Sequence, residues 1–154
     1  MPTEEYKKAY IFLSKKCSKK EISSREAIKA CSKFKLKIVE KNNLINELKK
    51  RNFINHERFS NAFVHDRFNF YRWGKNKIIH YLQQKGIEEF YIEMAIGSIS
   101  DKLYYKVLSE EAIKKYQLMK APEDFQSKQK LMKFLYQKGF ESELVFSEVE
   151  KLFP

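Results

Sequence analysis

Apolar residues recur along this chain at intervals of three and four positions, which places them on one face of an α-helix. Near the N-terminus that face is formed by Tyr6, Ala9, Tyr10, Leu13 and Cys17. Only 4 glycines and 3 prolines occur in 154 residues, too few for the many turns of a protein built from short strands. The pattern therefore predicts an all-α protein of amphipathic helices.

Side chains that accept hydrogen bonds from free helix amides mark where several of these helices begin. We expect such N-caps at Ser23 or Ser24, Asn55, Asp101 and Asp124. Ala121-Pro122 precedes the last of them and ends the helix before it, because proline disfavours helical geometry in the residue that it follows.

One helix sequence occurs twice in the chain. Residues 77–87 read KIIHYLQQKGI and residues 130–140 read KLMKFLYQKGF, so both copies close with a Lys-Gly pair. Glycine commonly follows a helix end because it adopts the left-handed conformation at little cost. Looser matches extend the recurrence to a period of about 50 residues, typical of helical repeat proteins.

This recurrence predicts three tandem repeats of three helices each, over residues 1–53, 54–99 and 100–154. A single repeat of this size cannot bury its apolar face alone, so neighbouring repeats stack. We expect an elongated, gently curved helical array.

The middle repeat begins with an aromatic helix that ends at Trp73-Gly74. We expect Trp73, and Phe70 with it, in the core between two helices, and Gly74 at a turn that a side chain would hinder. The residues that we expect to be the structural hallmark of the second and third repeats are Phe59, Phe63, Trp73, Gly74, Leu82, Gly86, Leu135 and Gly139.

The net charge is +11, and it is concentrated in the first half of the chain. Residues 1–77 carry a balance of +12 and all five arginines, whereas residues 78–154 carry −1. A one-sided basic charge attracts polyanions, which include nucleic acid, an acidic protein surface and an anionic membrane. A surface that is merely rich in lysine is the alternative explanation.

No pattern typical of catalysis or of a cofactor site is present. The three histidines form no metal-binding motif, and neither a phosphate-binding glycine loop nor a nucleophile elbow occurs. Acidic pairs such as Glu110-Glu111 are expected to be solvated. We therefore predict a protein that is not an enzyme and that binds neither a metal nor a cofactor.

The expected compartment is the cytoplasm. Cys17 and Cys31 form no CxxC motif and no disulfide framework, so they are predicted to be reduced and buried. The longest apolar run near the N-terminus, Ala9–Leu13, is too short for a signal peptide or a membrane span.

Basic and aromatic residues alternate in the middle of the chain. Arg67, Arg72, Lys75 and Lys77 surround Phe70, Tyr71 and Trp73. Such a mixture binds single-stranded nucleic acid through phosphate charges and base stacking. It is equally typical of aromatic core residues flanked by solvated basic ones, and the sequence leaves both interpretations open.

The stretch FINHERFSNAFVHDRFNFYRWGKNKIIHYLQQKGI, residues 53–87, resembles the hallmark segment of the RecX family of regulatory proteins. The order of features matches: an RFA-like helix start (here Arg58-Phe59-Ser60), an apolar–basic helix, a Trp-Gly turn and a KI…L…KGI helix. The chain departs from the family at Asn55-His56, where an acidic pair is frequent, and at Phe34-Lys35, where a Lys-Gly stop is expected.

The resemblance implies a modulator of the RecA recombinase. Members of the family lie in the groove of the RecA–single-stranded DNA filament, block its growth and lower ATP hydrolysis and strand exchange; some also bind DNA themselves. We expect a monomer whose partners are the RecA filament and single-stranded DNA. The candidate contact residues are Arg58, Arg67, Arg72, Lys75, Lys77 and Lys85.

Two alternative functions make different demands on the sequence. A general single-stranded nucleic-acid-binding protein would bind DNA or RNA tightly without RecA, with affinity that falls steeply as salt rises. A small helical nuclease would need a carboxylate cluster or a metal site, and the sequence offers neither.

Overall fold

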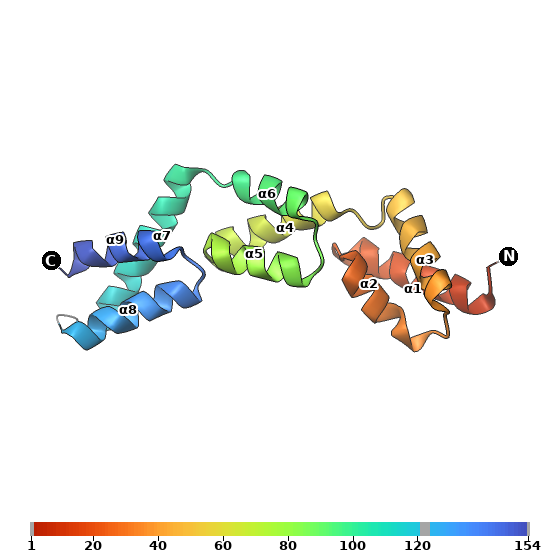
Figure 1. Ribbon diagram of the computed structural model, residues 1–154, viewed down its shortest axis with the longest axis horizontal. Helices are drawn as coiled ribbons and strands as arrows, with labels where there is room; N and C mark the ends of the chain where they lie inside the picture. The colour runs from red at the N-terminus through yellow and green to blue at the C-terminus, as the bar shows by residue number, and fades with distance from the viewer. Residues whose placement is uncertain (1, 121–123, 154) are drawn as a thin grey trace. The chain divides into compact units, whose positions relative to one another are not determined.

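The computed structural model describes residues 2–120 and 124–153 of the chain. In these residues every regular element is a helix, which confirms the predicted all-α class (Figure 1). The elements in chain order are α1 (Glu4–Lys19), α2 (Ser24–Ala30), the 3-10 helix η1 (Cys31–Lys33), α3 (Ile38–Lys50), α4 (His56–Asn69), α5 (Lys75–Gln84), α6 (Glu89–Gly97), α7 (Asp101–Leu118), α8 (Phe125–Gln137) and α9 (Ser142–Leu152).

The helices pack into two compact units. The first unit comprises Met1–Ala62 with Leu82–Ile92, and the second comprises Phe63–Tyr81 with Glu93–Pro154. The helices α4, α5 and α6 each give residues to both units. The repeats over residues 1–53, 54–99 and 100–154 therefore stay a prediction from sequence recurrence, since packing alone does not isolate the middle one.

The core of the first unit lies between α1, α2 and α3. Its buried side chains are Ala9, Leu13, Ile22, Ala27, Cys31, Leu44, Ile45, Leu48 and Ile54. Ala9 and Leu13 belong to the apolar face predicted near the N-terminus, so helical periodicity located this core correctly. Cys31 and Cys17 are both free thiols; Cys31 is buried as predicted, whereas Cys17 is half-buried.

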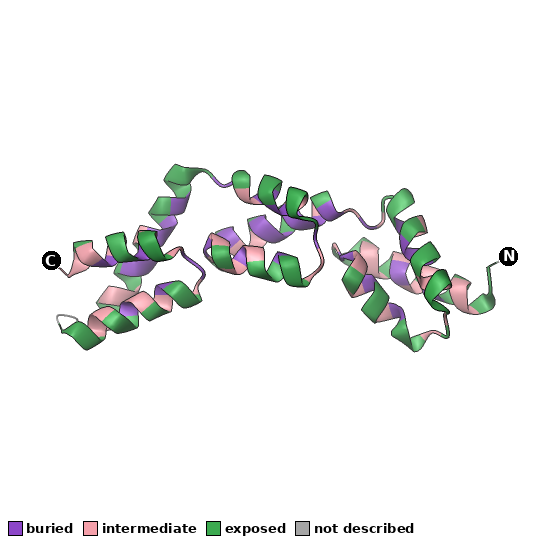
Figure 2. Ribbon diagram, viewed as in Figure 1, coloured by how far each residue is buried: buried purple, intermediate pink, exposed green. Residues whose placement is uncertain are grey.

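The core of the second unit gathers around Tyr104 of α7. Its ring centroid lies 5.9 Å from that of Phe68 and 5.5 Å from that of Phe140. Leu131 and Leu135 of α8 and Val145 and Val149 of α9 are fully buried. Figure 2 shows buried positions on all three helices of this region, α7, α8 and α9. Leu135 and Phe63 are predicted structural hallmark residues in this unit, and both are buried; Phe59 and Leu82, in the first unit, are buried as well.

Most of the predicted helix starts are observed. Ser23 forms a capping box with Glu26, and Asp124 accepts a hydrogen bond from the Ser127 amide at 2.7 Å. Asn55 accepts from the Arg58 amide at 2.8 Å.

The predicted cap at Asp101 is wrong. Ser100 is the N-cap of α7, because its hydroxyl accepts from the Leu103 amide at 3.1 Å. Asp101 is the first helical residue instead, where its negative charge favours the positive end of the helix dipole. The predicted helix break at Ala121-Pro122 lies outside the described residues.

Candidate functional site

Two of the six predicted contact residues, Arg58 and Lys85, lie in the first unit, where carboxylates already pair with them. Arg58 Nε donates to Glu21 Oε2 at 2.6 Å. Lys85 Nζ donates to Glu26 Oε2 at 2.9 Å. Burial alone would raise the pKa of Glu26, but its hydrogen bonds with the Ser23 amide and Lys85 outweigh burial and hold that pKa below its usual range. Both cations therefore stabilise the fold of the first unit.

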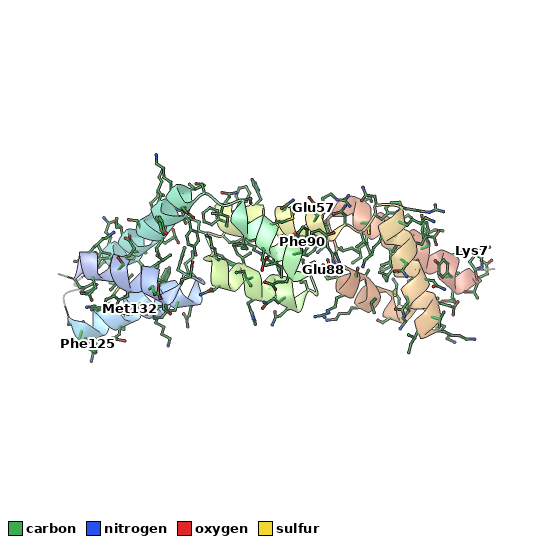
Figure 3. All side chains as sticks on the ribbon, turned by 45° about the horizontal axis from the view of Figure 1, so that its top comes forward. Lys7, Glu57, Glu88, Phe90, Phe125 and Met132 are labelled. Atoms are coloured by element: carbon green, nitrogen blue, oxygen red, sulfur yellow. The ribbon has the colours of Figure 1, made fainter. Side chains whose placement is uncertain are left out.

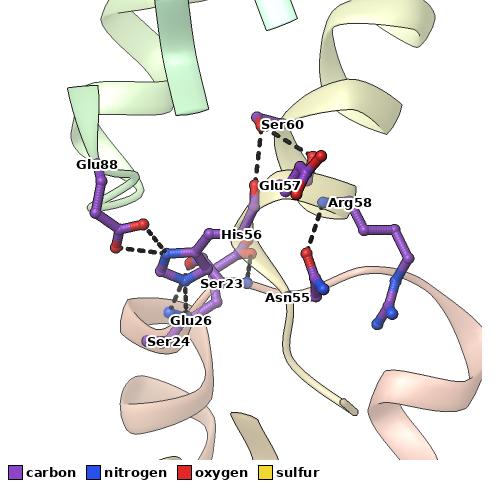
Figure 4. A network of polar contacts seen from close by, with 9 residues as sticks. All are labelled: Ser23, Ser24, Glu26, Asn55, His56, Glu57, Arg58, Ser60 and Glu88. Atoms are coloured by element: carbon purple, nitrogen blue, oxygen red, sulfur yellow. Dashed lines mark hydrogen bonds and ion pairs between the residues drawn. The ribbon is translucent and has the colours of Figure 1, made fainter. Parts of the chain in front are cut away.

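A buried histidine joins two helix starts in the first unit (Figure 4). The Ser24 amide donates to His56 Nε2 at 3.0 Å, and His56 Nδ1 lies 2.8 Å from Glu88 Oε1. Because Nε2 accepts, the ring proton sits on Nδ1 and is donated to the carboxylate. The Ser24–His56–Glu88 chain thus fixes α2, α4 and the turn before α6 with two hydrogen bonds.

The turn after α5 adds a second contact to the same region. Arg25 Nη1 donates to the carbonyl oxygen of Gln84 at 2.8 Å. Gly86 follows with a φ of +75°, and a Cβ at this position would lie 3.1 Å from Arg25 Nε. The glycine is needed for its left-handed backbone, as the repeated Lys-Gly pair predicted.

An equivalent chain of hydrogen bonds occurs in the second unit. The Lys75 amide donates to the Tyr104 hydroxyl at 2.9 Å, and that hydroxyl donates to the Glu141 carboxylate. Burial, together with the hydrogen bond to Glu141, raises the pKa of Tyr104 far above its ordinary value. Tyr104 therefore keeps its proton and connects the start of α5 to the start of α9.

Backbone contacts reinforce this second chain. The Gly74 amide donates to the Lys138 carbonyl at 2.7 Å, and the Asn76 amide donates to the Gly139 carbonyl at 2.9 Å. A Cβ on Gly74 would lie 2.3 Å from the Gly139 carbonyl carbon, and one on Gly139 would lie 2.4 Å from Lys77 Cβ. The two glycines let the backbones touch, so Gly74 serves close approach rather than a special turn conformation.

The two units therefore use the same joint. In each, the first amide of a helix donates to a side chain that in turn contacts a carboxylate two residues after a Lys-Gly pair, Glu88 or Glu141. The middle group differs: His56 is the first residue of α4, and Tyr104 is the fourth of α7. Comparison of the two repeated helix sequences predicted the glycines but not these chains of hydrogen bonds, although both copies share the spacing Gly-X-Glu.

A cationic–aromatic cluster surrounds Trp73 in the second unit. Lys77 Nζ lies 4.3 Å from the Trp73 ring centroid, and the Arg67 guanidinium lies 5.4 Å from it. The Tyr81 ring is 5.0 Å away, and Arg67 also pairs with Asp66. Trp73 packs between Phe63 of α4 and Tyr81 of α5, as predicted, but it is half-buried, so the expectation of a core position is wrong. Cations and a neighbouring ring already contact its faces, which leaves less of the indole for stacking on a base.

The predicted core position of Phe70 is wrong as well. Its side chain is 73 % exposed, and that of Tyr71 beside it is 55 % exposed. Both residues follow the last residue of α4, where the chain leaves the apolar face of the helix. Helical periodicity placed Phe70 on that face because it could not show that α4 ends at Asn69.

Arg72 is held by two carboxylates that were expected to be solvated. Its Nε donates to Glu111 Oε2 at 2.9 Å and its Nη2 donates to Glu110 Oε1 at 3.3 Å. Glu111 is only 7 % exposed and also accepts from Lys138 Nζ at 2.7 Å. Burial raises the pKa of Glu111, but hydrogen bonds and charges from Lys138 and Arg72 outweigh it and hold that pKa below its usual range. The prediction that both Glu110 and Glu111 are solvated is therefore wrong for Glu111.

Only two of the six candidate cations, Lys75 and Lys77, have no carboxylate partner in the part of the chain that the structure describes. Each ammonium group instead lies over a ring, that of Tyr104 at 4.6 Å and that of Trp73 at 4.3 Å. They are two residues apart in the first turn of α5. The sequence-predicted set therefore separates into four cations with internal partners and two that remain available.

No feature of a metal or membrane site appears in the described residues. Within residues 2–120 and 124–153, no three histidine, cysteine or acidic side chains come together as metal ligands would. None of the described helices is long and apolar enough to span a bilayer.

Comparison with known proteins identifies the relatives of this chain. Residues 55–96 match the second three-helix domain of RecX, and residues 103–147 match the third. The crystal structure of RecX from Lactobacillus salivarius superimposes with a TM-score of 0.83 at 20% identity, over 97% of each chain. A crystal structure titled regulatory protein RecX gives a TM-score of 0.84 at 20% identity, over 96% of this chain and 72% of that one.

These likenesses agree with one another. No protein in the curated set matches the chain significantly by sequence, and at 20% identity the two crystal structures establish the fold alone. The two domain matches, however, together cover more than half of the chain and follow one another in the family's order. The chain therefore belongs to the RecX family.

Proposed function

We propose that this protein is a regulator of the RecA recombinase that acts in the cytoplasm as a monomer. It binds the RecA–single-stranded DNA filament and lowers RecA ATP hydrolysis, filament extension and strand exchange. The observation that carries the proposal is the match of two consecutive segments to the second and third three-helix domains of RecX. The resemblance of residues 53–87 to the family's hallmark segment supports it further.

The described surface suits a binding protein. Phe90 on α6 is 64 % exposed and Phe125 at the start of α8 is 73 % exposed; both are labelled in Figure 3. Exposed aromatic side chains are frequent at protein interfaces, where they contribute a large share of the affinity. Apolar and basic contacts together therefore favour a protein–DNA filament as the partner, and binding rather than catalysis as the mode of action.

Within the predicted contact set, we propose Lys75 and Lys77 as the residues that face the filament. Arg58, Arg67, Arg72 and Lys85 are ion-paired inside the fold, so releasing them for a partner would cost the existing contacts. Reversal of Arg72 would also set a carboxylate against Glu111 and disturb the fold. The two lysines avoid both complications.

The double variant Lys75→Glu/Lys77→Glu should bind RecA–DNA filaments about tenfold more weakly, because two favourable charge contacts become repulsive. A glutamate in the first turn of α5 is compatible with the helix dipole, so helicity should not change. Co-sedimentation with preformed filaments measures the loss. Lys102→Glu/Lys106→Glu on α7 is the matched control, since both lysines are exposed and unpaired within the described residues. Equal losses in the two variants would refute the placement.

A further inference from the structure

The arginines of this protein and the lysines of its first 53 residues differ in their contacts. All five arginines donate to groups inside the fold: Arg25 to a carbonyl, and Arg51, Arg58, Arg67 and Arg72 to carboxylates. The lysines of residues 1–53 behave differently. Of these thirteen side chains, only Lys7 and Lys8 form ion pairs within the described residues. The available positive charge of the N-terminal region is therefore carried by lysine alone.

Some of these lysines converge on two phenylalanine rings in the first unit. Lys33 Nζ lies 3.7 Å from the ring centroid of Phe12 and 5.4 Å from that of Phe34. Lys16 Nζ lies 5.7 Å from the Phe12 centroid, and the two rings are 5.6 Å apart. Two ammonium groups thus share one ring, and neither has a carboxylate partner in the described part of the chain.

The segment that follows extends the same surface. Lys33, Lys35 and Lys37 are exposed, whereas the alternate residues Phe34 and Leu36 pack against the core. This alternation turns three ammonium groups outward over a short stretch of chain. We call Phe12, Lys16, Lys33, Phe34, Lys35 and Lys37 the Phe12 patch.

Two carboxylates lie near the Phe12 patch. That of Glu40 accepts a hydrogen bond from the Lys37 backbone amide at 3.0 Å. The other is that of Glu5. It accepts a hydrogen bond from the Lys35 backbone amide at 3.2 Å and lies 3.9 Å from Lys8 Nζ. The Glu5 carboxylate therefore contacts the Lys35 amide and the Lys8 ammonium group, and not the ammonium groups of Lys16 and Lys33. Within the described residues, neither Lys16 nor Lys33 forms an ion pair with these carboxylates.

We propose that the Phe12 patch binds the sugar–phosphate backbone of single-stranded nucleic acid without sequence preference. Like charges held together repel, and an anion that neutralises them relieves this repulsion. Lysine is a compact point charge suited to phosphate, whereas carboxylates of an acidic protein favour the planar fork of arginine, which this surface lacks.

The proposal does not depend on RecA, so it is tested in its absence. Fluorescence anisotropy of a labelled oligothymidine should show binding that weakens steeply with salt. Lys16→Glu/Lys33→Glu should bind at least tenfold more weakly. The slope of log affinity against log salt should fall by about 1.4, since each phosphate contact to a single strand contributes about 0.7.

The matched control is again Lys102→Glu/Lys106→Glu, which changes the net charge by the same amount on exposed lysines of the second unit. It should retain most of the affinity. Equal losses in both variants, or no loss in either, would overturn the proposal, because binding would then follow total charge or lie elsewhere. Circular dichroism of both variants confirms that they remain helical.

Two further outcomes separate this proposal from the RecA proposal. If Lys16→Glu/Lys33→Glu keeps its affinity for the oligonucleotide but loses binding to RecA filaments, the Phe12 patch contacts an acidic protein surface and the proposal is wrong. If the variant loses its affinity for the oligonucleotide and the native protein has no effect on RecA, the Phe12 patch binds nucleic acid as proposed and the RecA proposal fails.

Discussion

Replacing Gly139 with alanine should lower the free energy of unfolding by about 3 kcal/mol, the sum of a strained backbone and an overpacked contact. Gly139 has a φ of +100°, where residues with a side chain are strained. The added Cβ would also lie 2.4 Å from Lys77 Cβ and 2.6 Å from the Lys77 backbone nitrogen. Backbone atoms cannot move aside as a flexible side chain does, so the joint between α5 and the α8–α9 turn has to open.

Urea unfolding followed by circular dichroism measures this effect. Gly97→Ala is the matched control, because no atom outside its chain neighbours and its own helix backbone lies within 4 Å of the position that its Cβ would take, and its φ is not in the left-handed region. We expect that variant to stay within about 0.5 kcal/mol of the native protein. A Gly139→Ala protein as stable as Gly97→Ala would contradict the close contact described at the joint.

The second large effect is expected at Glu111, whose replacement by glutamine should cost about 2 kcal/mol at neutral pH. The carboxylate is nearly buried and accepts from both Arg72 and Lys138. A neutral amide in place of the Glu111 carboxylate removes the negative charge that stabilises Arg72 and Lys138 close to one another. The cost stays below that of a fully buried pair because the side chains of Arg72 and Lys138 are 33% and 23% exposed.

Glu110→Gln provides the control for this variant. Glu110 contacts the same Arg72, at 3.3 Å, but its side chain is 51% exposed. An exposed ion pair contributes little, so we expect a change of about 0.5 kcal/mol or less. If the two variants lost equal stability, burial would not be what makes Glu111 important.

The pH dependence of unfolding gives a second test of Glu111. Its pKa is lower in the folded protein than its ordinary value of 4.5, so its contribution is complete above that value and disappears as the pH falls through the folded pKa. The native protein should therefore lose stability below about pH 4.5 more steeply than Glu111→Gln. Acid titrations of the unfolding midpoint that run parallel for the two proteins would contradict this assignment.

Much of the fold could be predicted from periodicity and from local chemistry. The apolar spacing of residues 4–17 placed Ala9 and Leu13 in the core, and the duplicated Lys-Gly pair located both left-handed glycines. Ser23, Asn55 and Asp124 mark helix starts through hydrogen bonds that span three residues. Such features depend on neighbours in the sequence, which is why one sequence reveals them.

The features that were missed depend on residues far apart in the chain. Glu111 is buried because Arg72 and Lys138, 39 and 27 residues away, supply its hydrogen bonds. His56 and Tyr104 make equivalent hydrogen bonds, but His56 is the first residue of α4 and Tyr104 is the fourth residue of α7. An alignment of the repeats therefore does not pair these two residues. Trp73 is half-buried, and Lys77 and Arg67 lie over its ring, contacts that periodicity does not reveal.

The nucleic-acid-binding surface that we propose in the first unit differs from the one that charge counting suggested. The sequence suggested that the arginines of the first half, together with its lysines, face a polyanion. The structure gives every arginine an internal acceptor and leaves the lysines of residues 1–53 largely unpaired within the described residues. The difference follows from chemistry, because the guanidinium fork suits fixed contacts inside a fold.

The most direct test of the central claim is RecA ATPase activity on single-stranded DNA, titrated with this protein and with RecA from the same source. A RecA regulator should inhibit strongly at well below one molecule per RecA protomer, because each bound molecule affects a filament rather than a single subunit. Inhibition that begins only when the protein is abundant enough to coat the DNA would show a competing nucleic-acid binder. No inhibition or other change in the ATPase rate at any ratio would contradict the proposed function.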